Sequence, residues 1–323
     1  MDRRSFLAVA GALAACARPT RSASPRSRSA SPRSHTAAAA PSPASPAPQP
    51  SSPPPDRTVE VLDWTFQTEL GGSKRAVILA PRPIPAGTRL PVLVALHGLG
   101  ETTDPTTGAW GWAKSYGLDR TYDRLLHPPL FPEDFQGLVT SERLSEINES
   151  LAAAPLGGVI VACPYLPKDI GGATPIELYA RWLGERLLPR VREELPARAD
   201  VASTGIDGVS LGGWAAIRLA MSRPDLFGVV GALQPAIVDS AMVDAATSLI
   251  AQHLGKRPLR LVTSTEDMYR NTLVELDKRL TGKGVAHEFA ITPGPHDYPW
   301  NKGPGGIEML LWHDRTLHGG RGT

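Results

Sequence analysis

Short apolar runs, each bounded by Gly, Pro or polar residues, alternate with longer amphipathic stretches from about residue 58 onward. Runs of this kind are typical of buried, largely parallel strands, because helices cover both faces of such a sheet. Two earlier runs, at 59–66 and 75–81, predict an opening antiparallel pair. The remaining strands are predicted at 91–98, 157–165, 202–207, 228–235, 258–264 and 286–292.

Helical segments are predicted between these strands. The longest, 174–195, begins with a capping box formed by Thr174 and Glu177, with Pro175 at the first helical position. Two more, at 211–224 and 271–284, end at Pro or Gly. Alternating strands and helices predict a three-layer α/β/α fold with a mostly parallel central sheet.

One connection, at about 102–156, is much longer than the others and is read as an insertion in a catalytic domain that spans 58–323. Long excursions of this kind commonly shape a binding cleft or a lid. Trp110, Trp112 and Tyr116 lie in it. They either line an aromatic or sugar-binding cleft or form a small core of the insertion itself, and the sequence does not separate the two.

The first 16 residues indicate an export signal. Arg3 and Arg4 precede an apolar run that ends at Ala15, too short to span a bilayer. The segment resembles a twin-arginine signal, and the residues before and including Cys16 resemble a bacterial lipobox. Lipidation of Cys16 is therefore expected to anchor the protein to the membrane of the bacterial cell envelope, the alternative being an ordinary signal peptide.

Residues 17–57 are mostly Ser, Pro, Ala and Arg, a composition that cannot bury enough apolar surface to fold. They predict a disordered, semi-rigid linker, with binding to an anionic membrane surface as the alternative. Residues 1–57 carry eight arginines against two aspartates, whereas the remainder has 26 basic and 30 acidic residues. The domain is thus mildly acidic, and nucleic acid is not an expected partner.

The stretch IDGVSLGGW places a glycine two residues before and two residues after Ser210. A predicted strand precedes this G-x-S-x-G pattern and a predicted helix follows it, which is the arrangement of a nucleophile elbow. The glycines are needed where strand and helix approach closely, and the turn lifts the serine hydroxyl out of the sheet. Ser210 is therefore the candidate nucleophile.

A serine hydroxyl needs a base, and in this arrangement the acid and the histidine follow the serine in that order. Glu266 and Asp267 come just after one predicted strand, and His296 lies in a Gly/Pro loop after the last one. Asp267 is favoured over Glu266 because it lies further into the loop. Asp207 and Asp297 are interpreted as helix or loop charges.

Backbone N–H groups are candidates for an oxyanion hole. Leu211 begins the helix after the serine, and Leu99 follows the His97–Gly98 pair that ends an earlier strand. His97 itself is expected to be structural, and Cys163, in an apolar run, a buried structural thiol. No metal-ligand pattern, phosphate loop or dinucleotide fingerprint is present, so neither a metal nor a cofactor is predicted.

These motifs, LHGLG, GVSLGGW, STEDMYRN and PGPHDYPW, resemble the α/β-hydrolase fold and, in particular, the putative-esterase (esterase D-like) family. That family includes S-formylglutathione hydrolases, feruloyl esterases and mycolyltransferases, and the resemblance covers about 59–317. It implies a Ser210–His296–Asp267 triad with Leu99 and Leu211 as oxyanion donors. Ser264 replaces a glycine that is often found in the family, and Asp207 replaces an apolar strand residue.

The chain is thus expected to be an exported serine esterase that cleaves a small-molecule or polysaccharide-linked ester through an acyl-enzyme intermediate. Two alternatives remain open. One is an acyltransferase of the mycolyltransferase type that acts on envelope sugars, and the other is a catalytically silent envelope binding protein.

Overall fold

The computed structural model describes residues 58–67 and 73–319 of the chain. The chain divides into two units, Met1–Asp56 and Arg57–Thr323, and the described residues belong to the second. The predicted signal peptide (1–16) with Cys16 and nearly all of the predicted linker (17–57) fall in the first unit, and both lie outside the described residues. None of the helices in the described part is both long and apolar enough to cross a membrane.

A single eight-stranded sheet forms the centre of the fold, in the order β1-β2-β4-β3-β5-β6-β7-β8. β1 and β2 are antiparallel, as the sequence predicted, and β2 is also antiparallel to β4, whereas all later pairs are parallel. The predicted α/β fold with a mostly parallel sheet is therefore confirmed. The strands are β1 (Thr58–Thr65), β2 (Arg75–Arg82), β3 (Val92–Leu96), β4 (Ile160–Pro164), β5 (Thr204–Gly208), β6 (Val229–Leu233), β7 (Leu259–Glu266) and β8 (Glu288–Pro295).

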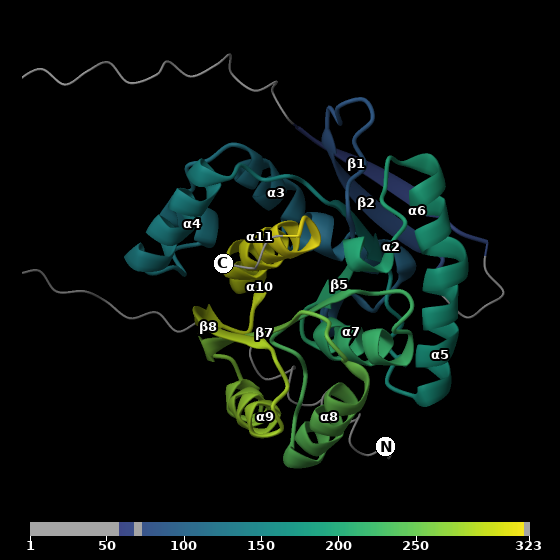
Figure 1. Cartoon of the computed structure of the whole chain (residues 1–323), viewed down its shortest axis with the longest axis vertical. Coiled ribbons are helices and arrows are strands. Elements are labelled where there is room, and N and C mark those ends of the chain that lie inside the picture. Colours follow the sequence, from purple (N-terminus) through teal and green to yellow (C-terminus); the bar gives the residue numbers. More distant parts are fainter. Residues whose placement is uncertain (1–57, 68–72, 320–323) are drawn as a thin grey trace, which may run out of the picture. The chain divides into compact units, whose positions relative to one another are not determined.

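Helices cover both faces of this sheet (Figure 1). α7 packs on β3, β5 and β6 and has α5 and α8 as neighbours, while α11 packs on β5, β6 and α3. The helices are α2 (Pro105–Ala109), α3 (Leu118–Leu126), α4 (Ser141–Ala153), α5 (Ala173–Trp182), α6 (Leu188–Glu194), α7 (Leu211–Ser222), α8 (Ser240–His253), α9 (Arg270–Gly282), α10 (Tyr298–Trp300) and α11 (Gly306–Leu317). Shorter 3₁₀ or π turns are η2 (Leu99–Glu101), η3 (Gly111–Ser115), η4 (Pro132–Phe135), η5 (Leu183–Leu187), η6 (Val201–Ser203) and η7 (Asn301–Gly305).

The last two residues of β5 show that α7 and α11 lie on opposite faces. The Asp207 side chain reaches His313 on α11, whereas a Cβ atom at Gly208 would collide with Gly212 on α7. Successive side chains of a strand point to opposite faces, so the two helices sandwich the strand that leads to Ser210. The candidate nucleophile therefore leaves the sheet between two helical layers.

The segment predicted as one helix over 174–195 differs in detail. α5 begins one residue earlier and its N-cap is Gly172, with no side-chain cap, so Thr174 and Glu177 form no capping box at this terminus. The helix then widens into the π turn η5 before α6 begins. Pro189 lies at the start of α6, and because proline has no N–H it cannot close an ordinary helical hydrogen bond there.

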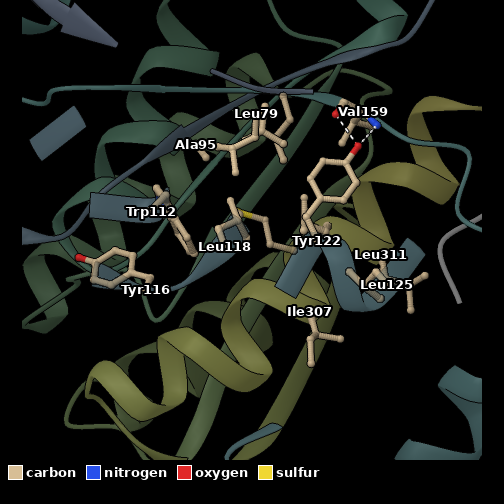
Figure 2. Close-up of a cluster of buried hydrophobic side chains, with 14 of the residues drawn as sticks. Leu79, Ala95, Trp112, Tyr116, Leu118, Tyr122, Leu125, Val159, Ile307 and Leu311 are labelled. Carbon is tan, nitrogen blue, oxygen red and sulfur yellow. Dashed lines mark hydrogen bonds between the residues drawn. The ribbon is translucent and has the colours of Figure 1, made fainter. Parts of the chain in front are cut away.

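The long connection folds into five helical pieces, α2, η3, α3, η4 and α4, and joins the main core. Figure 2 shows Trp112, Leu118 and Tyr122 of this insertion packed with Leu79 and Ala95 of the sheet. The Tyr122 hydroxyl donates to the carbonyl oxygen of Val159 at 2.6 Å and accepts from its N–H at 2.7 Å. Within the connection, α4 carries mostly polar side chains and buries only Ile147 and Leu151. Hydrophobic burial and the two hydrogen bonds between the Tyr122 hydroxyl and the Val159 backbone thus fix the insertion to the sheet.

Candidate active site

Ser210 lies at the sharp turn between β5 and α7, at φ 58° and ψ −116°. A positive φ is unfavourable for a residue with a side chain and persists only where the surroundings impose it. Here the Ser210 N–H donates to the carbonyl oxygen of Leu233 at 2.9 Å, and the Ser210 carbonyl accepts from Trp214 and Ala236. The turn is therefore held from β6 as well as from α7.

The two glycines that frame Ser210 have no room for a side chain. A Cβ atom at Gly208 would lie 2.5 Å from the carbonyl carbon of Gly212, and one at Gly212 would lie 2.3 Å from the carbonyl oxygen of Leu96. Contacts this short with backbone atoms cannot be relieved by moving a side chain. The close approach of strand and helix that the sequence pattern predicted is thus a property of the structure.

Asp267 and His296, which are 29 residues apart, meet beyond the carboxyl ends of β7 and β8. His296 Nδ1 lies 2.9 Å from Asp267 Oδ1. The Asp267 side chain is fully buried and also accepts from the Thr263 hydroxyl at 2.7 Å and from the Tyr269 N–H at 3.0 Å. A carboxylate with three donors is fixed in place, and it favours the imidazole tautomer that keeps a proton on Nδ1. Glu266 is exposed and makes no such contact.

Ser210 and His296 are left with free reactive atoms. Within residues 58–67 and 73–319, neither the Ser210 hydroxyl nor His296 Nε2 has a hydrogen-bond partner, and neither atom is sealed from solvent. Tyr269 packs edge-on against the His296 ring with 5.4 Å between the centroids. Burial, together with the Asp267 charge, raises the pKa of Tyr269 to about 12, so its phenol stays neutral beside the imidazole.

Gln234, which the sequence reasoning missed, ties the loops of the acid and the histidine together. Its amide nitrogen donates to the Ser264 hydroxyl at 2.7 Å and to the carbonyl oxygen of Pro295 at 3.1 Å. The backbone of this buried residue has φ 41°. Ser264, which stands where the family often has a glycine, therefore supplies a hydroxyl acceptor for Gln234 that a glycine would lack. The only sequence signal for Gln234 is its position directly after the strand β6.

The N–H groups of Leu99 and Leu211 have no acceptor in the described part of the chain. Each lies at the first position of a helical turn, where no intrahelical acceptor exists. The β3 loop also lies against the nucleophile, because a Cβ atom at Gly98 would be 3.7 Å from Ser210 Cβ. Two unpaired donors thus flank Ser210 from two different elements, as an oxyanion site requires.

His97, which precedes this loop, uses both of its ring nitrogens in the structure. Nε2 accepts from the Leu166 N–H at 2.8 Å, and since that nitrogen is an acceptor, Nδ1 carries the proton and donates to the carbonyl oxygen of Gly98 at 2.8 Å. Burial lowers the pKa of His97 to about 4, which keeps the ring neutral. The geometry matches the structural role expected from the sequence.

Asp207 corrects an expectation. The sequence predicts a helix or loop charge at this position, but Asp207 is buried in β5 and its Oδ2 lies 3.0 Å from His313 Nε2. Its Oδ1 accepts from the Gly208 N–H at 2.7 Å. Gly231 makes room for the pair, because a Cβ atom there would lie 1.9 Å from Asp207 Oδ2. Asp297, the other such aspartate, caps α10 by accepting from the Trp300 N–H.

The aromatic residues of the insertion that were candidates for substrate binding, Trp110, Trp112 and Tyr116, are buried or half-buried. Trp112 and Tyr116 are buried in the hydrophobic core and pack edge-on against each other. Trp110 is half-buried, donates its indole N–H to Asp63 at 3.1 Å and faces the Lys114 ammonium. Trp112 belongs to the main hydrophobic core together with Leu79 and Ala95 of the sheet, so it neither lines an open cleft nor forms a separate core of the insertion. Tyr116 differs, because its hydroxyl accepts from the Gly98 N–H beside Ser210.

The described residues contain no group of three or more His, Cys, Asp or Glu side chains arranged to hold a metal ion. Cys163 is buried in β4, and burial raises the pKa of its thiol, which is therefore a poor nucleophile. The chemistry available at this site is that of a serine, a histidine and a buried aspartate beside two free N–H groups.

Comparison with known sequences points to esterases. Residues 164–300 match the model of the putative esterase family. The iron(III) salmochelin esterase of Escherichia coli O6:H1 (strain CFT073) is 31% identical over 176 residues, which cover 50% of this chain and 39% of that enzyme. The chain therefore matches less than half of the length of that relative.

Solved structures of low sequence identity share the fold. A ferulic acid esterase matches with a TM-score of 0.59 and 16% identity, over 80% of this chain and 99% of its own. The S-formylglutathione hydrolase of Staphylococcus aureus matches with a TM-score of 0.54 and 14% identity, over 81% and 98%. The fluorophosphonate-binding serine hydrolase F of the same organism gives 0.56 and 12%, over 80% and 99%. The chain thus has the α/β-hydrolase fold of these enzymes, and its residues 164–300 carry the sequence pattern of the putative esterase family.

Proposed function

We propose that the protein is a serine hydrolase that cleaves carboxylic esters through Ser210, His296 and Asp267. The observation that carries the proposal is the buried Asp267 carboxylate 2.9 Å from His296 Nδ1, which leaves Nε2 free on the side of the ring away from the acid. A family match to esterases over the segment that contains all three residues supports it.

The reaction begins when the Ser210 hydroxyl oxygen attacks the ester carbonyl carbon while His296 Nε2 takes the hydroxyl proton. Asp267 keeps the proton on Nδ1 and stabilises the imidazolium that forms. The Leu99 and Leu211 N–H groups donate to the oxyanion. The tetrahedral intermediate collapses, and the leaving alcohol takes the proton from His296.

Water completes the cycle. His296 Nε2 removes a proton from a water molecule as its oxygen attacks the acyl-Ser210 carbonyl, and a second tetrahedral intermediate releases the carboxylic acid. The proton returns to the Ser210 oxygen. No step needs a metal or a redox cofactor.

Substitution of Ser210 by Ala tests the proposal. We expect Ser210→Ala to lose hydrolysis of p-nitrophenyl esters and labelling by a fluorophosphonate probe while keeping the wild-type unfolding transition. A variant that retains either reaction at the wild-type level shows that Ser210 is not the nucleophile. A panel of acetyl, butyryl, octanoyl and feruloyl esters defines the acyl preference, and iron(III) salmochelin belongs in it because of the related esterase.

We further propose that the protein is exported to the bacterial cell envelope, tethered by lipid at Cys16 and held off the membrane by the 17–57 linker. The basis is the sequence of the first 57 residues. In the bacterial host, Cys16→Ala should release the enzyme from the membrane fraction and abolish incorporation of labelled palmitate. Equal membrane association of the variant and the wild type contradicts the anchor.

A further inference from the structure

A buried carboxyl group lies next to the proposed oxyanion loop and has no part in the reaction derived above. Glu101 ends η2, the turn that contains Leu99, and is only 2% exposed. Tyr298 donates its hydroxyl to Glu101 Oε1 at 2.6 Å, and Tyr116 donates its own to Oε2. Tyr116 comes from the insertion and Tyr298 from the segment after His296, so three separate parts of the chain meet at one side chain.

The directions of these hydrogen bonds are fixed. The Tyr116 hydroxyl has one proton and gives it to Glu101, so the same oxygen is free to accept, and it does so from the Gly98 N–H at 3.0 Å. Burial, reinforced by the charge of Glu101, raises the pKa of Tyr116 well above its usual value, so the phenol remains a donor. Glu101 thereby holds the Gly98 N–H through the Tyr116 hydroxyl.

Tyr298 secures the other side of the loop. A Cβ atom at Gly100 would lie 3.0 Å from the Tyr298 hydroxyl, whereas one at Gly98 would lie 3.1 Å from the Tyr116 hydroxyl. Burial and the hydrogen bond to Glu101 raise the pKa of Tyr298 to about 12, so this hydroxyl also stays protonated. The Gly98–Gly100 backbone is therefore confined between two phenols that share one carboxyl group.

The confined residues are those that face the nucleophile. Gly98 lies against Ser210, and the Leu99 N–H, which lies between the two confined glycines, has no acceptor in the described part of the chain. A purely stabilising core would fill this space with apolar side chains, because burying a carboxyl group is costly even when it is hydrogen-bonded. A polar cluster at this position has a clearer use in fixing the direction of one N–H.

We propose that Glu101 is a positioning residue for catalysis. It acts through Tyr116 and Tyr298 to hold the Gly98–Gly100 loop, so that the Leu99 N–H points to the oxyanion formed at Ser210. The inference rests on the proposed function.

The test combines steady-state kinetics with hydrogen–deuterium exchange of the 96–101 segment in the full-length enzyme. A misplacement of about 1 Å costs on the order of 100-fold in rate, and we expect about that loss of kcat for Glu101→Ala with KM within about threefold. The Gly98 amide should exchange about tenfold faster, because its acceptor is no longer held. A boronic acid that forms a tetrahedral adduct with Ser210 should lose affinity in parallel with kcat/KM.

Milder variants keep the test decisive if Glu101→Ala fails to fold. Glu101→Gln retains one acceptor oxygen for Tyr116 and should lose about tenfold in kcat. Tyr298→Phe, at a residue that is 47% exposed, should lose about threefold. Glu193→Ala removes an exposed carboxylate on α6 and serves as the matched control, with unchanged kcat and exchange.

The outcomes separate this inference from the proposed function. Unchanged kcat in Glu101→Gln and Tyr298→Phe, with Ser210→Ala inactive, overturns the positioning role and leaves the serine mechanism standing. A wild-type protein that hydrolyses no ester and reacts with no fluorophosphonate refutes the function, whereas exchange at Gly98 still reports whether Glu101 holds the loop. Faster exchange without any change in the rate or in boronic acid affinity reduces Glu101 to a structural residue.

Discussion

Two of the Asp–His pairs in the described part of this domain, one beyond the ends of β7 and β8 and one beneath the Ser210 turn, have nearly the same length but differ in access. Asp267 and His296 are 2.9 Å apart beyond the ends of β7 and β8, and the His296 side chain is 10% exposed. Asp207 and His313 are 3.0 Å apart beneath the Ser210 turn, and His313 is fully buried. The chemistry of the two pairs is the same, so the surroundings decide which of them has a free imidazole nitrogen.

The two pairs also use opposite ring nitrogens. His296 bonds its aspartate through Nδ1 and leaves Nε2 open, whereas His313 bonds through Nε2 and leaves Nδ1 buried without a partner. Because His313 Nδ1 is sealed in the core, this pair presents no ring nitrogen to a substrate. The pair beneath the turn is suited to support, and the pair at the loops is suited to proton transfer.

Matched Asp→Asn substitutions should separate the two pairs most strongly. Asp267→Asn leaves the shape of the acid intact but removes the charge and favours the wrong His296 tautomer, so we expect kcat to fall about 10⁴-fold. Asp207→Asn should keep kcat of the folded protein within a few-fold of the wild type. Ester hydrolysis measured on equal amounts of folded protein checks both variants. Similar losses of kcat would contradict the different roles assigned to the two pairs.

Stability should show the reverse order. His313→Ala leaves the Asp207 carboxylate buried without its partner and opens a cavity, so we expect a loss of about 3 kcal/mol or more in the free energy of unfolding. His296→Ala, at a partly open site where Asp267 keeps the Thr263 hydroxyl and the Tyr269 N–H as donors, should cost less than His313→Ala. Urea unfolding of the two variants provides the measurement. A larger destabilisation by His296→Ala contradicts the supporting role of the Asp207–His313 pair.

His97, the other buried histidine of the described residues, tests whether burial alone controls the protonation of an imidazole. The pKa of His97 is about 4 in the folded protein and 6.5 in the unfolded chain, so between these values the unfolded state binds more protons. Stability should therefore be complete above pH 6.5 and fall by roughly 3 kcal/mol as the pH drops towards 4. Urea unfolding at pH 7 and 4.5 measures the fall. In His97→Gln it should be smaller by that amount, and an unchanged fall excludes His97 as its source.

The smallest effect is expected at the neighbouring carboxylate. Glu266 is exposed and does not contact His296, so Glu266→Gln should change kcat by less than about twofold and leave its pH profile in place. Rate profiles between pH 5 and 9 provide the check. A loss comparable to that of Asp267→Asn would move the acid from Asp267 to Glu266.

The turn at Ser210 was readable from sequence because its requirements are local. A strand, two glycines at fixed spacing and a helix encode the close approach of β5 and α7, and the clash distances at Gly208 and Gly212 give the physical reason. The positions of Asp267 and His296 were readable because parallel strands deliver their carboxyl ends to the same edge of the sheet. Their order along the chain was therefore sufficient to predict that Ser210, Asp267 and His296 lie at the same edge of the sheet.

Sequence patterns did not predict the start of α5 or the pairing of Asp207 with His313. Thr174 and Glu177 have the spacing of a capping box, yet the helix begins one residue earlier, since the packing of the preceding loop decides which residue becomes the cap. Asp207 has the composition of a surface charge, and only a histidine 106 residues later makes its burial possible.

The sequence by itself determined the alternation of strands and helices and the elbow at Ser210, and it favoured Asp267 over Glu266. The tertiary structure decided that Trp112 belongs to the core, that Asp207 pairs with His313, and that Tyr298 reaches Glu101 across 197 positions of the chain. Local backbone geometry depends on neighbours in sequence, which a pattern records. The partner of a buried polar side chain is set by which layers pack together, and no spacing along the chain records that.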